Sequence, residues 1–428
     1  MVKNSYSIEK KSNWKYNYTV KKILILIIIL NLTLFIFSQS DYETNFLDSY
    51  LQFEQFFQQI GGDYGTTFFP FLTLGYGGRE KGLSGAFTAV ADDISTLEVN
   101  PAGTASLKFT ELFFSHNKLM GDVNYNTLAY TMRFNDLGFG VGARVLYMPF
   151  THFDQWGTNV GSGVITYSVF TLNAAYNFLR SYKYFGLSAG ANVKLYVYGV
   201  PEEIASNQTK VNLVFDLGLL TRFNFLKFYN TYEKNFSIGI AARNLGPFTD
   251  DEPPPTTLSL GAGWKPIEIF LVSLDFSYLI NYSELTYLNW SVSSGLEWKF
   301  TKYSSLIGGV TVKSSPSFSL GVALDFEDFK ITVIYNPDFV DVSRFSISGS
   351  LKMGDLGREK KRLLLKKMYS DALKLMSDGN YTGAQDVLVE ILKTDYAYTP
   401  AKKSLLYCKK QLETEDELKD LFNSKRLK

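Results

Sequence analysis

The sequence contains few of the residues from which redox, metal and catalytic sites are built. Its 428 residues include one cysteine, Cys408, and two histidines, His116 and His152. A single cysteine excludes an internal disulfide and a cysteine-based zinc site, and two histidines leave few ligands for another metal. We therefore expect no metal and no cofactor.

An excess of one charge is also lacking, because 43 lysines and arginines are balanced by 42 aspartates and glutamates. This balance gives no reason to expect a nucleic-acid partner. The chain has no GxxxxGK[ST] loop, and its glycines near residues 77–85 form no GxGxxG turn after a strand. Binding of nucleic acids or nucleotides is therefore not indicated.

Long apolar runs are absent except near the N-terminus. There, five lysines between Lys10 and Lys22 precede an apolar run from Ile23 to Phe37, and small and polar residues follow. Fifteen residues fall short of the ~20 that a transmembrane helix needs. This pattern predicts a signal peptide over residues 1–40, with a retained N-terminal anchor helix as the alternative. No cysteine marks a lipoprotein cleavage point.

Aromatic residues and glycines are plentiful, at 16% of the chain and 33 positions respectively. This mixture suits many strands with aromatic ends. Residues 41–106 are rich in glycine and aromatics, residues 107–353 alternate with a period of two, and residues 358–423 have a helical period. We expect three corresponding domains after the signal peptide.

The alternation in residues 107–353 runs for nine or more residues at a time. In "VNLVFDLGLL", for example, Val211, Leu213, Phe215, Leu217 and Leu219 share one face, opposite Asn212, Val214, Asp216 and Gly218. A tilted strand that crosses a membrane needs about 9–11 residues. Turn signals divide the region into fourteen strands, which begin near Leu107, Val123, Gly138, Val164, Tyr184, Lys210, Phe236, Thr256, Phe270, Tyr287, Ser304, Ser317, Ile331 and Arg344.

A soluble β-sandwich would alternate in the same way, but two features favour an outer-membrane barrel. The polar face carries charges of both signs, as a polar lumen would: Arg144, Lys194, Asp216, Arg243, Asp275, Glu297, Asp325 and Lys352. Aromatic residues gather toward strand ends, where interfacial girdles lie: Phe134, Tyr147, Phe178, Phe223, Trp264, Tyr282, Tyr287 and Phe300. We predict an all-β transmembrane barrel of about fourteen antiparallel strands.

The lumen of such a barrel is too wide for its own side chains to fill, so a plug is expected. The segment "GGREKGLSGAFTAVADDISTLEVNPAG", residues 77–103, has small residues that allow close backbone approach. Its Asp92-Asp93 pair can cap a turn or meet lumen cations, and Asn100-Pro101 favours a fixed turn.

This segment resembles the N-terminal plug motif of the FadL-type outer-membrane transporters and their PorV-like relatives. The matching residues are Gly82, Gly85, Ala86, Ala89, Ala91, Asp92, Asp93, Ser95, Asn100, Pro101, Ala102 and Gly103. A second PorV-like element is "RNLGP", Arg243 to Pro247, whereas Leu97-Glu98-Val99 replaces the usual aromatic residue before Asn-Pro. The resemblance implies a fourteen-stranded barrel with an N-terminal plug. For the FadL branch it also implies a hydrophobic ligand that passes between plug and wall.

A catalytic and a metal-binding hypothesis for the plug residues are both less well supported than a structural role. Ser84 or Ser95 with His116 and Asp92 could form a hydrolytic triad, but no nucleophile elbow is present. Calcium binding at Asp92 and Asp93 lacks EF-type ligand spacing, so we expect a turn or an ion pair instead. We expect no catalytic residues and no enzyme activity.

The C-terminal region resembles one tetratricopeptide repeat. Its packing positions hold Ala372, Leu375, Gly379, Tyr381, Ala384, Leu388 and Ile391. A further helix follows, with Cys408 on its apolar face. About three repeats are usually needed to bury a continuous core, so a partner or self-association should complete this one. A small self-sufficient helical cap is the alternative.

Together these features predict an outer-membrane protein with its C-terminal helices in the periplasm. The FadL resemblance implies passage of hydrophobic small molecules, with long-chain fatty acids as the expected class. The alternative is a PorV-like secretion-associated or scaffolding protein whose helical tail docks a periplasmic partner. An apolar pocket between plug and wall would favour the first. The expected partners are membrane lipid, a hydrophobic ligand and a possible periplasmic protein.

Overall fold

The computed structural model of the protein describes residues 70–119, 123–153, 156–157, 159–180, 184–201, 209–231, 233–249, 253–280, 289–313, 316–337 and 344–426. The predicted signal peptide, residues 41–69, and the aromatic residues Tyr282 and Tyr287 lie outside this part of the chain. What the sequence predicts for them remains a prediction.

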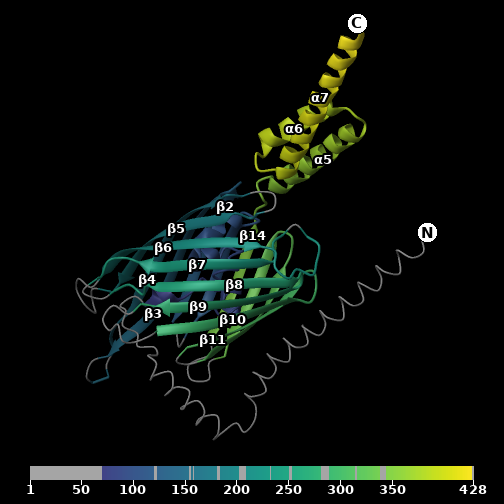
Figure 1. Cartoon of the computed structure of the whole chain (residues 1–428). Helices are drawn as coiled ribbons and strands as arrows, with labels where there is room; N and C mark the ends of the chain where they lie inside the picture. Colours follow the sequence, from purple (N-terminus) through teal and green to yellow (C-terminus); the bar gives the residue numbers. More distant parts are fainter. Residues whose placement is uncertain are drawn as a thin grey trace.

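Fourteen antiparallel strands of the described chain form one closed barrel, in which sequence neighbours pair and β1 pairs with β14 (Figure 1). The strands are β1 Glu111–Lys118, β2 Asn124–Phe134, β3 Leu137–Phe153, β4 Asn159–Phe178, β5 Leu187–Gly199, β6 Lys210–Phe223, β7 Phe236–Leu245, β8 Thr257–Ile267, β9 Phe270–Leu279, β10 Asn289–Lys299, β11 Ser304–Val312, β12 Ser317–Asp325, β13 Phe329–Asn336 and β14 Arg344–Lys352. The predicted fold and strand number are confirmed.

Three predicted strand starts differ from the observed ones by three residues or more, namely those near Leu107, Val164 and Tyr184, the last of which is observed at Leu187. The first strand begins at Glu111 rather than Leu107, because residues 107–110 lead out of the lumen into the wall. The fourth strand begins at Asn159 rather than Val164, because Gly161-Ser162-Gly163 continues the strand and pairs with β3. The glycines there had suggested a turn.

The two faces of the strands have opposite chemistry, as predicted. On β6, Leu217 points outward and is 54% exposed, whereas its neighbour Asp216 is fully buried inside the barrel. The same outward face of β6 also exposes Val211, Leu213, Phe215 and Leu219. An apolar exterior on a barrel with no open sheet edge is the surface that a bilayer covers. The fold is therefore that of a transmembrane β-barrel of the outer-membrane type.

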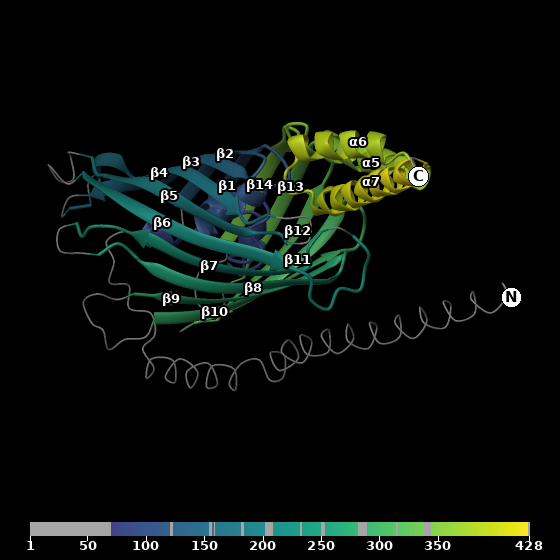
Figure 2. The ribbon, with the colours of Figure 1, turned by 45° about the horizontal axis from the view of Figure 1, so that its top comes forward.

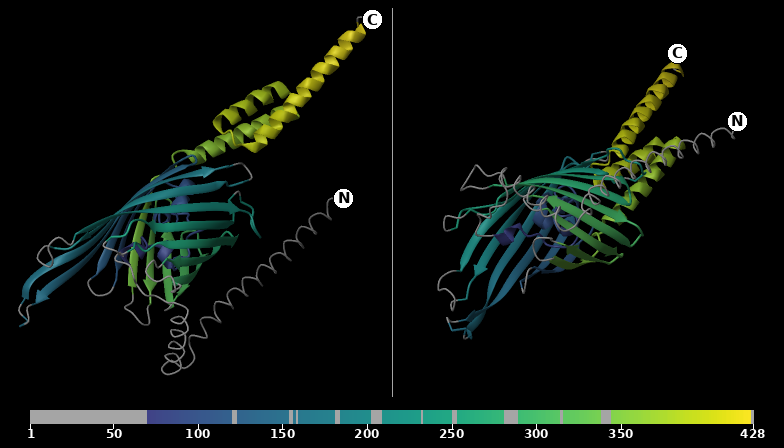
Figure 3. Two further views of the ribbon diagram at one scale, coloured as in Figure 1. Left: turned by 60° about the vertical axis from the view of Figure 1, so that its left-hand side comes forward. Right: turned by 90° about the horizontal axis from the view of Figure 1, so that it is seen from below.

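Three helices follow the barrel and lie beyond one of its ends (Figures 1 and 2). They are α5 Arg358–Ser377, α6 Tyr381–Thr394 and α7 Thr399–Arg426, and α7 projects past the other two (Figure 3). Their shared core consists of Leu365, Ala372, Ala384, Leu388, Ile391, Ala401 and Cys408. Within the described chain, no helix combines the length and apolar character needed to span a bilayer.

The residues proposed for a tetratricopeptide repeat lie in or beside this core. Leu375 and Tyr381 pack against it, and Gly379 takes a positive φ of 77° in the turn between α5 and α6. This packing fits a helical pair of any kind, so the resemblance to a tetratricopeptide repeat remains a prediction.

Candidate functional site

Residues 70–106, called the plug below, run through the lumen (Figure 2). The plug contains four short helical segments: η1 Pro70–Thr73, α3 Arg79–Gly82, α4 Thr96–Val99 and η2 Pro101–Ser106. Nearly all of its side chains between Tyr76 and Leu107 are buried or half-buried. The lumen is therefore occupied by the chain's own N-terminal region.

Glycines of the wall allow the strands to approach the plug closely. A Cβ atom added to any of four inward-facing glycines would lie only 2.2–2.6 Å from a plug backbone atom: Gly138 at Thr104, Gly190 at Pro101, Gly239 at Thr88 and Gly309 at Leu83. The sequence had predicted close approach only for the plug's own glycines. The feature of the sequence that could have predicted close approach at the wall is the recurrence of glycines on the polar face of the strands.

The plug's glycines serve different purposes. A Cβ at Gly82 would lie 2.6 Å from the Ile334 side chain, and one at Gly103 would lie 2.0 Å from Thr96, so both sites require close approach. Gly85 differs, because the nearest atom to an added Cβ is 4.0 Å away. Its φ of 80° is the reason for glycine there, so the expected close contact at Gly85 is wrong.

The Asn100-Pro101 turn joins two parts of the plug to the wall. The buried Asn100 side chain accepts a hydrogen bond from the Ala102 N–H at 3.2 Å and caps η2, with Pro101 at its first position. Its amide donates to the carbonyl of Thr88 at 2.8 Å and to that of Leu219 on β6 at 3.0 Å. One side chain thus fixes the turn, the preceding plug segment and the wall together.

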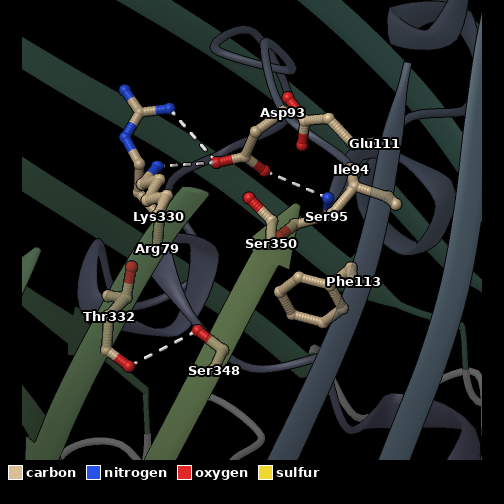
Figure 4. A pocket seen from close by; sticks show the side chains of 10 residues that line it. All are labelled: Arg79, Asp93, Ile94, Ser95, Glu111, Phe113, Lys330, Thr332, Ser348 and Ser350. Atoms are coloured by element: carbon tan, nitrogen blue, oxygen red, sulfur yellow. Dashed lines mark hydrogen bonds and ion pairs between the residues drawn. The ribbon is translucent and has the colours of Figure 1, made fainter. Parts of the chain in front are cut away.

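Arg79 is the centre of one charged cluster between plug and wall, called the Arg79 cluster (Figure 4). Its guanidinium binds Glu297 of β10 at 2.6 and 2.7 Å and also pairs with Asp92. Asp93 lies 3.5 Å from Arg79 and 3.6 Å from Lys330 of β13, and it accepts the Ser95 N–H at 3.0 Å. The aspartate pair therefore makes both the turn and the ion pairs expected of it.

The electrostatics of the Arg79 cluster favour the charged forms. Burial alone would raise the pKa of Asp92, but Arg79 and Lys265 hold it well below its usual range. Lys265 lies 3.1 Å from Asp92. A gap of about 20 Å³ remains beside Asp93 and Lys330, which is room for about one water molecule.

Glu98 is the centre of a second cluster, called the Glu98 cluster. It lies 3.1 Å from Lys194 of β5 and 3.6 Å from Arg144 of β3. Lys194 also pairs with Asp216 of β6 at 2.8 Å, so two positive and two negative side chains meet with 1% exposure or less. Burying charges is costly unless they are paired. Removing one partner of a buried pair commonly lowers the stability of the fold by about 3–5 kcal/mol.

Neutral side chains complete the Glu98 cluster. Asn192 donates to Asp216 at 2.7 Å and to the carbonyl of Leu97 in the plug at 2.6 Å. Asn244, with a positive φ of 57°, donates its backbone N–H to Asp216 at 2.7 Å across a bulge between β6 and β7. The "RNLGP" element therefore supports the cluster through its asparagine.

The remaining predicted lumen charges have distinct positions. Asp275 of β9 accepts the N–H groups of Phe87 and Thr88 at 3.0 and 2.7 Å, so it also binds the plug. Arg243 is half-buried and lies 3.5 Å from Ser259 on the wall. Asp325 pairs with Lys352 at the rim and is more exposed.

The structure does not bring together the residues of the hypothetical hydrolytic triad Ser84, His116 and Asp92. His116 bonds to Asn126 at 2.8 Å, Ser84 bonds to Ser319 at 2.6 Å, and Asp92 belongs to the Arg79 cluster. The part of the chain that the structure describes holds no group of three or more metal-ligating side chains.

The plug has a different surface toward each end of the barrel. Away from the helices, Phe71 and Leu72 pack with Tyr125, Leu146, Val169, Tyr196 and Val214, and with the half-buried Tyr167 and Tyr198. We call these residues the aromatic cluster. Toward the helices lies a polar cavity of about 570 Å³, lined by residues of the Arg79 cluster together with basic residues such as Lys299 and Arg222.

Fold and site together define a transmembrane β-barrel whose lumen is closed by its own N-terminal segment. The chain belongs to the uncharacterised protein family UPF0164, whose family model matches residues 57–353. A UPF0164 protein of Treponema pallidum (strain Nichols) is 24% identical over 372 residues, which is 81% of this chain and 84% of the relative. Another from the same strain is 35% identical over 173 residues, which is 40% of this chain and 42% of that relative.

Among solved structures, the P. putida toluene transporter TodX is similar at 12% identity with a TM-score of 0.46. The similarity covers 65% of this chain and 99% of that one. The KdgM porin is similar at 14% identity with a TM-score of 0.30, over 57% of this chain and 99% of that one.

Proposed function

We propose that the protein gives hydrophobic small molecules passage across the outer membrane, with long-chain fatty acids as the class that the plug motif implies. The observation that carries the proposal is the aromatic cluster, in which plug and wall residues pack together at the mouth away from the helices. A hydrophobic molecule that reaches this mouth meets apolar side chains of the plug itself. Such contacts suit an apolar ligand better than an ion or a sugar.

Passage requires the plug to move, because it fills the lumen. The plug is held against the wall by ion pairs and hydrogen bonds, for example from Arg79 to Glu297 and from Asn100 to Leu219. Its only covalent link to the strands is the backbone that continues into β1. Ions and water can replace the ion pairs and hydrogen bonds when the plug shifts, and the rigid ladder of the wall need not open. A ligand that displaces Phe71 and Leu72 from the aromatic cluster would start this movement.

The lengths of the connections support an orientation. Beside the helices, the connections at 135–136, 268–269, 300–303 and 326–328 have two to four residues, although those at 179–186 and 224–235 have eight and twelve. At the other end, nine to eleven residues of sequence separate the strands of the pairs β5–β6, β7–β8 and β9–β10. Outer-membrane barrels typically have short periplasmic turns and longer extracellular loops. Since four of the six connections beside the helices are short, we propose that the helices lie in the periplasm and that the aromatic cluster faces the outside.

A reversible lock tests whether plug movement is needed. The hydroxyls of Ser84 in the plug and Ser319 in β12 are 2.6 Å apart, so a Ser84→Cys/Ser319→Cys pair in a Cys408→Ala background should form a disulfide. We expect uptake of a labelled fatty acid by cells to fall to background when this pair is oxidised. Reductant should restore it.

The matched control joins two wall residues instead. The hydroxyls of Ser259 in β8 and Ser277 in β9 are 2.8 Å apart, so Ser259→Cys/Ser277→Cys should also oxidise but leaves the plug untied. Uptake by the oxidised control should match that of the unmodified protein. Undiminished uptake through the oxidised Ser84–Ser319 variant would contradict passage by plug movement.

A scaffolding role is the second candidate, and exposed apolar residues on the helices favour it. Leu363, Leu406 and Tyr407 are at least 50% exposed, as a docking surface for a periplasmic protein would be. Truncation after Met353 separates the candidates. Passage of small molecules should survive the truncation, whereas a scaffold would lose its function.

A further inference from the structure

A cleft of about 650 Å³ lies between the barrel rim and the C-terminal helices. Its floor is the chain that leaves the plug at Leu107–Phe109 together with the rim residue Arg133. Its other walls come from the first turns of α5 and from Tyr398 before α7. A cleft of this volume is within the range of small-molecule sites.

The cleft is built by specific bonds. Arg358 at the start of α5 donates to the carbonyls of Leu107 at 3.0 Å and Lys108 at 2.6 Å, and Asp355 accepts the Glu359 N–H at 2.6 Å. Asp355 therefore accepts an N–H of the first turn of α5, and Arg358 fixes the start of the helix to the rim. These contacts give the cleft a defined shape.

The cleft contains an excess of positive charge. All four of its acidic residues have partners. Glu233 pairs with Lys108 at 2.5 Å, Asp395 lies 3.9 Å from Arg180, and Glu359 pairs with Arg362 at 2.5 Å. Asp355 accepts the backbone N–H groups of Gly357 and Glu359. Within the described residues, no carboxylate lies within ion-pair distance of four other lining cations: Arg133, Arg358, Lys361 and Lys366. The guanidinium groups of Arg133 and Arg358 instead meet backbone carbonyls.

Apolar surface adjoins these cations. Leu363 is 55% exposed and lines the cleft, as do Phe109 and Tyr398, which are half-buried. Cations beside an apolar wall match a molecule that has a negative head and a hydrocarbon chain. A purely ionic ligand would leave the apolar wall unused.

We propose that this cleft binds a single-chain amphiphile whose headgroup is an oxyanion, either a carboxylate or a phosphate monoester. The headgroup contacts Arg133, Arg358, Lys361 and Lys366, and the chain lies along Phe109, Leu363 and Tyr398. This site is separate from the aromatic cluster, and binding to it does not require the plug to move. Binding in this cleft can therefore be tested independently of passage through the barrel.

The test uses the full chain in nanodiscs of zwitterionic phosphatidylcholine. Dodecanoate, dodecyl phosphate and dodecanol, each with a photoreactive diazirine near the chain end, are cross-linked and mapped by mass spectrometry. We expect saturable labelling of peptides that contain residues 358–366 or 395–398 by one or both anionic probes, and none by dodecanol. The stronger of the two anionic probes identifies the headgroup.

Charge reversals on α5 supply the matched comparison. Lys361→Glu/Lys366→Glu changes two lining residues, and Lys360→Glu/Lys367→Glu changes two exposed neighbours outside the cleft by the same charge. We expect the first pair to weaken anionic labelling about tenfold, which corresponds to ~1.4 kcal/mol, and the second to leave it within about twofold. Since all four side chains lie on the exposed or half-buried surface of the helix, both variants should fold.

Three results would overturn the proposal. Equal labelling by dodecanol would show that the head is not recognised, and equal loss in both variants would show only general attraction to a basic helix. Absence of saturable labelling in the cleft, with an acidic peptide competing for the same lysines instead, would assign the surface to a protein partner.

Discussion

At the residue scale, adjacent glycines of one strand differ in whether the plug touches them. A Cβ at Gly309 would lie 2.6 Å from the Leu83 carbonyl carbon, whereas one at Gly308 would have its nearest neighbour at 3.8 Å. We expect Gly309→Ala to destabilise the seated plug by ~1–3 kcal/mol through overpacking, and Gly308→Ala to be nearly neutral. Protease cleavage within residues 77–103 of the folded protein measures this difference. Equal protection in the two variants would count against close packing at Gly309.

Glu80 makes seating of the plug depend on pH. Burial and the neighbouring Glu98 raise the pKa of Glu80 from 4.5 to about 7, although Lys81, Arg243 and Arg144 oppose the shift. The seated plug therefore binds this proton more tightly than the released plug does. Seating is unaffected below pH 4.5, weakens as pH rises from 4.5 to 7, and stays weaker above pH 7.

The full effect of Glu80 is of the order of 3 kcal/mol, because one pKa unit corresponds to ~1.4 kcal/mol. We expect the intact plug to be cleaved faster by a protease at pH 8 than at pH 5.5, after correction for the protease's own pH dependence. Glu80→Gln keeps the shape without the titration, so its cleavage rate should be low and nearly constant over this range. A steep pH profile in Glu80→Gln would assign the dependence to another group.

At the element scale, the strands were predictable because one physical rule governs each of them. Lipid outside and a polar interior impose a period of two, so the faces of β6 follow from its sequence. The predicted plug turn at Asn100-Pro101 is likewise a local property. The partners of the lumen charges were not predictable, because Glu98 and Lys194 are 96 residues apart and their pairing depends on how the plug folds.

The strand faces predict how a charge affects assembly. Leu217→Arg places a cation on the outer face in the middle of β6, at an expected cost of about 2–4 kcal/mol, whereas Val211→Arg near the strand end should cost about 0–1 kcal/mol. Unfolding in lipid vesicles by denaturant measures both. Asp216→Asn is not a suitable neutral control, although Asp216 faces the lumen, because Asp216 pairs with Lys194 and accepts the Asn244 N–H.

At the scale of the whole molecule, closure of the barrel and closure of its lumen depend on different bonds. The wall is joined by ladder hydrogen bonds from β1 round to β14, and the helices continue from β14 on the side where the plug enters β1. The plug adds bonds to the inner wall but none that complete the ladder. The barrel should therefore persist without the plug, and the plug should stay seated without the helices.

Planar-bilayer conductance tests that separation. Deletion of residues 77–103 removes the plug residues of both clusters, among them Arg79 and Glu98. The wall residues Arg144, Lys194 and Glu297 then face a lumen that water can fill. Since solvated charges need no protein partner, we expect this variant to fold and to show open-channel current steps where the intact protein conducts little. Removal of residues 354–428 is the matched control, because it deletes a larger part of the chain but keeps the plug, and it should conduct as little as the intact protein. If the plug deletion folds and its current does not rise, the segment is not the barrier of the lumen, and passage by plug movement loses its structural basis.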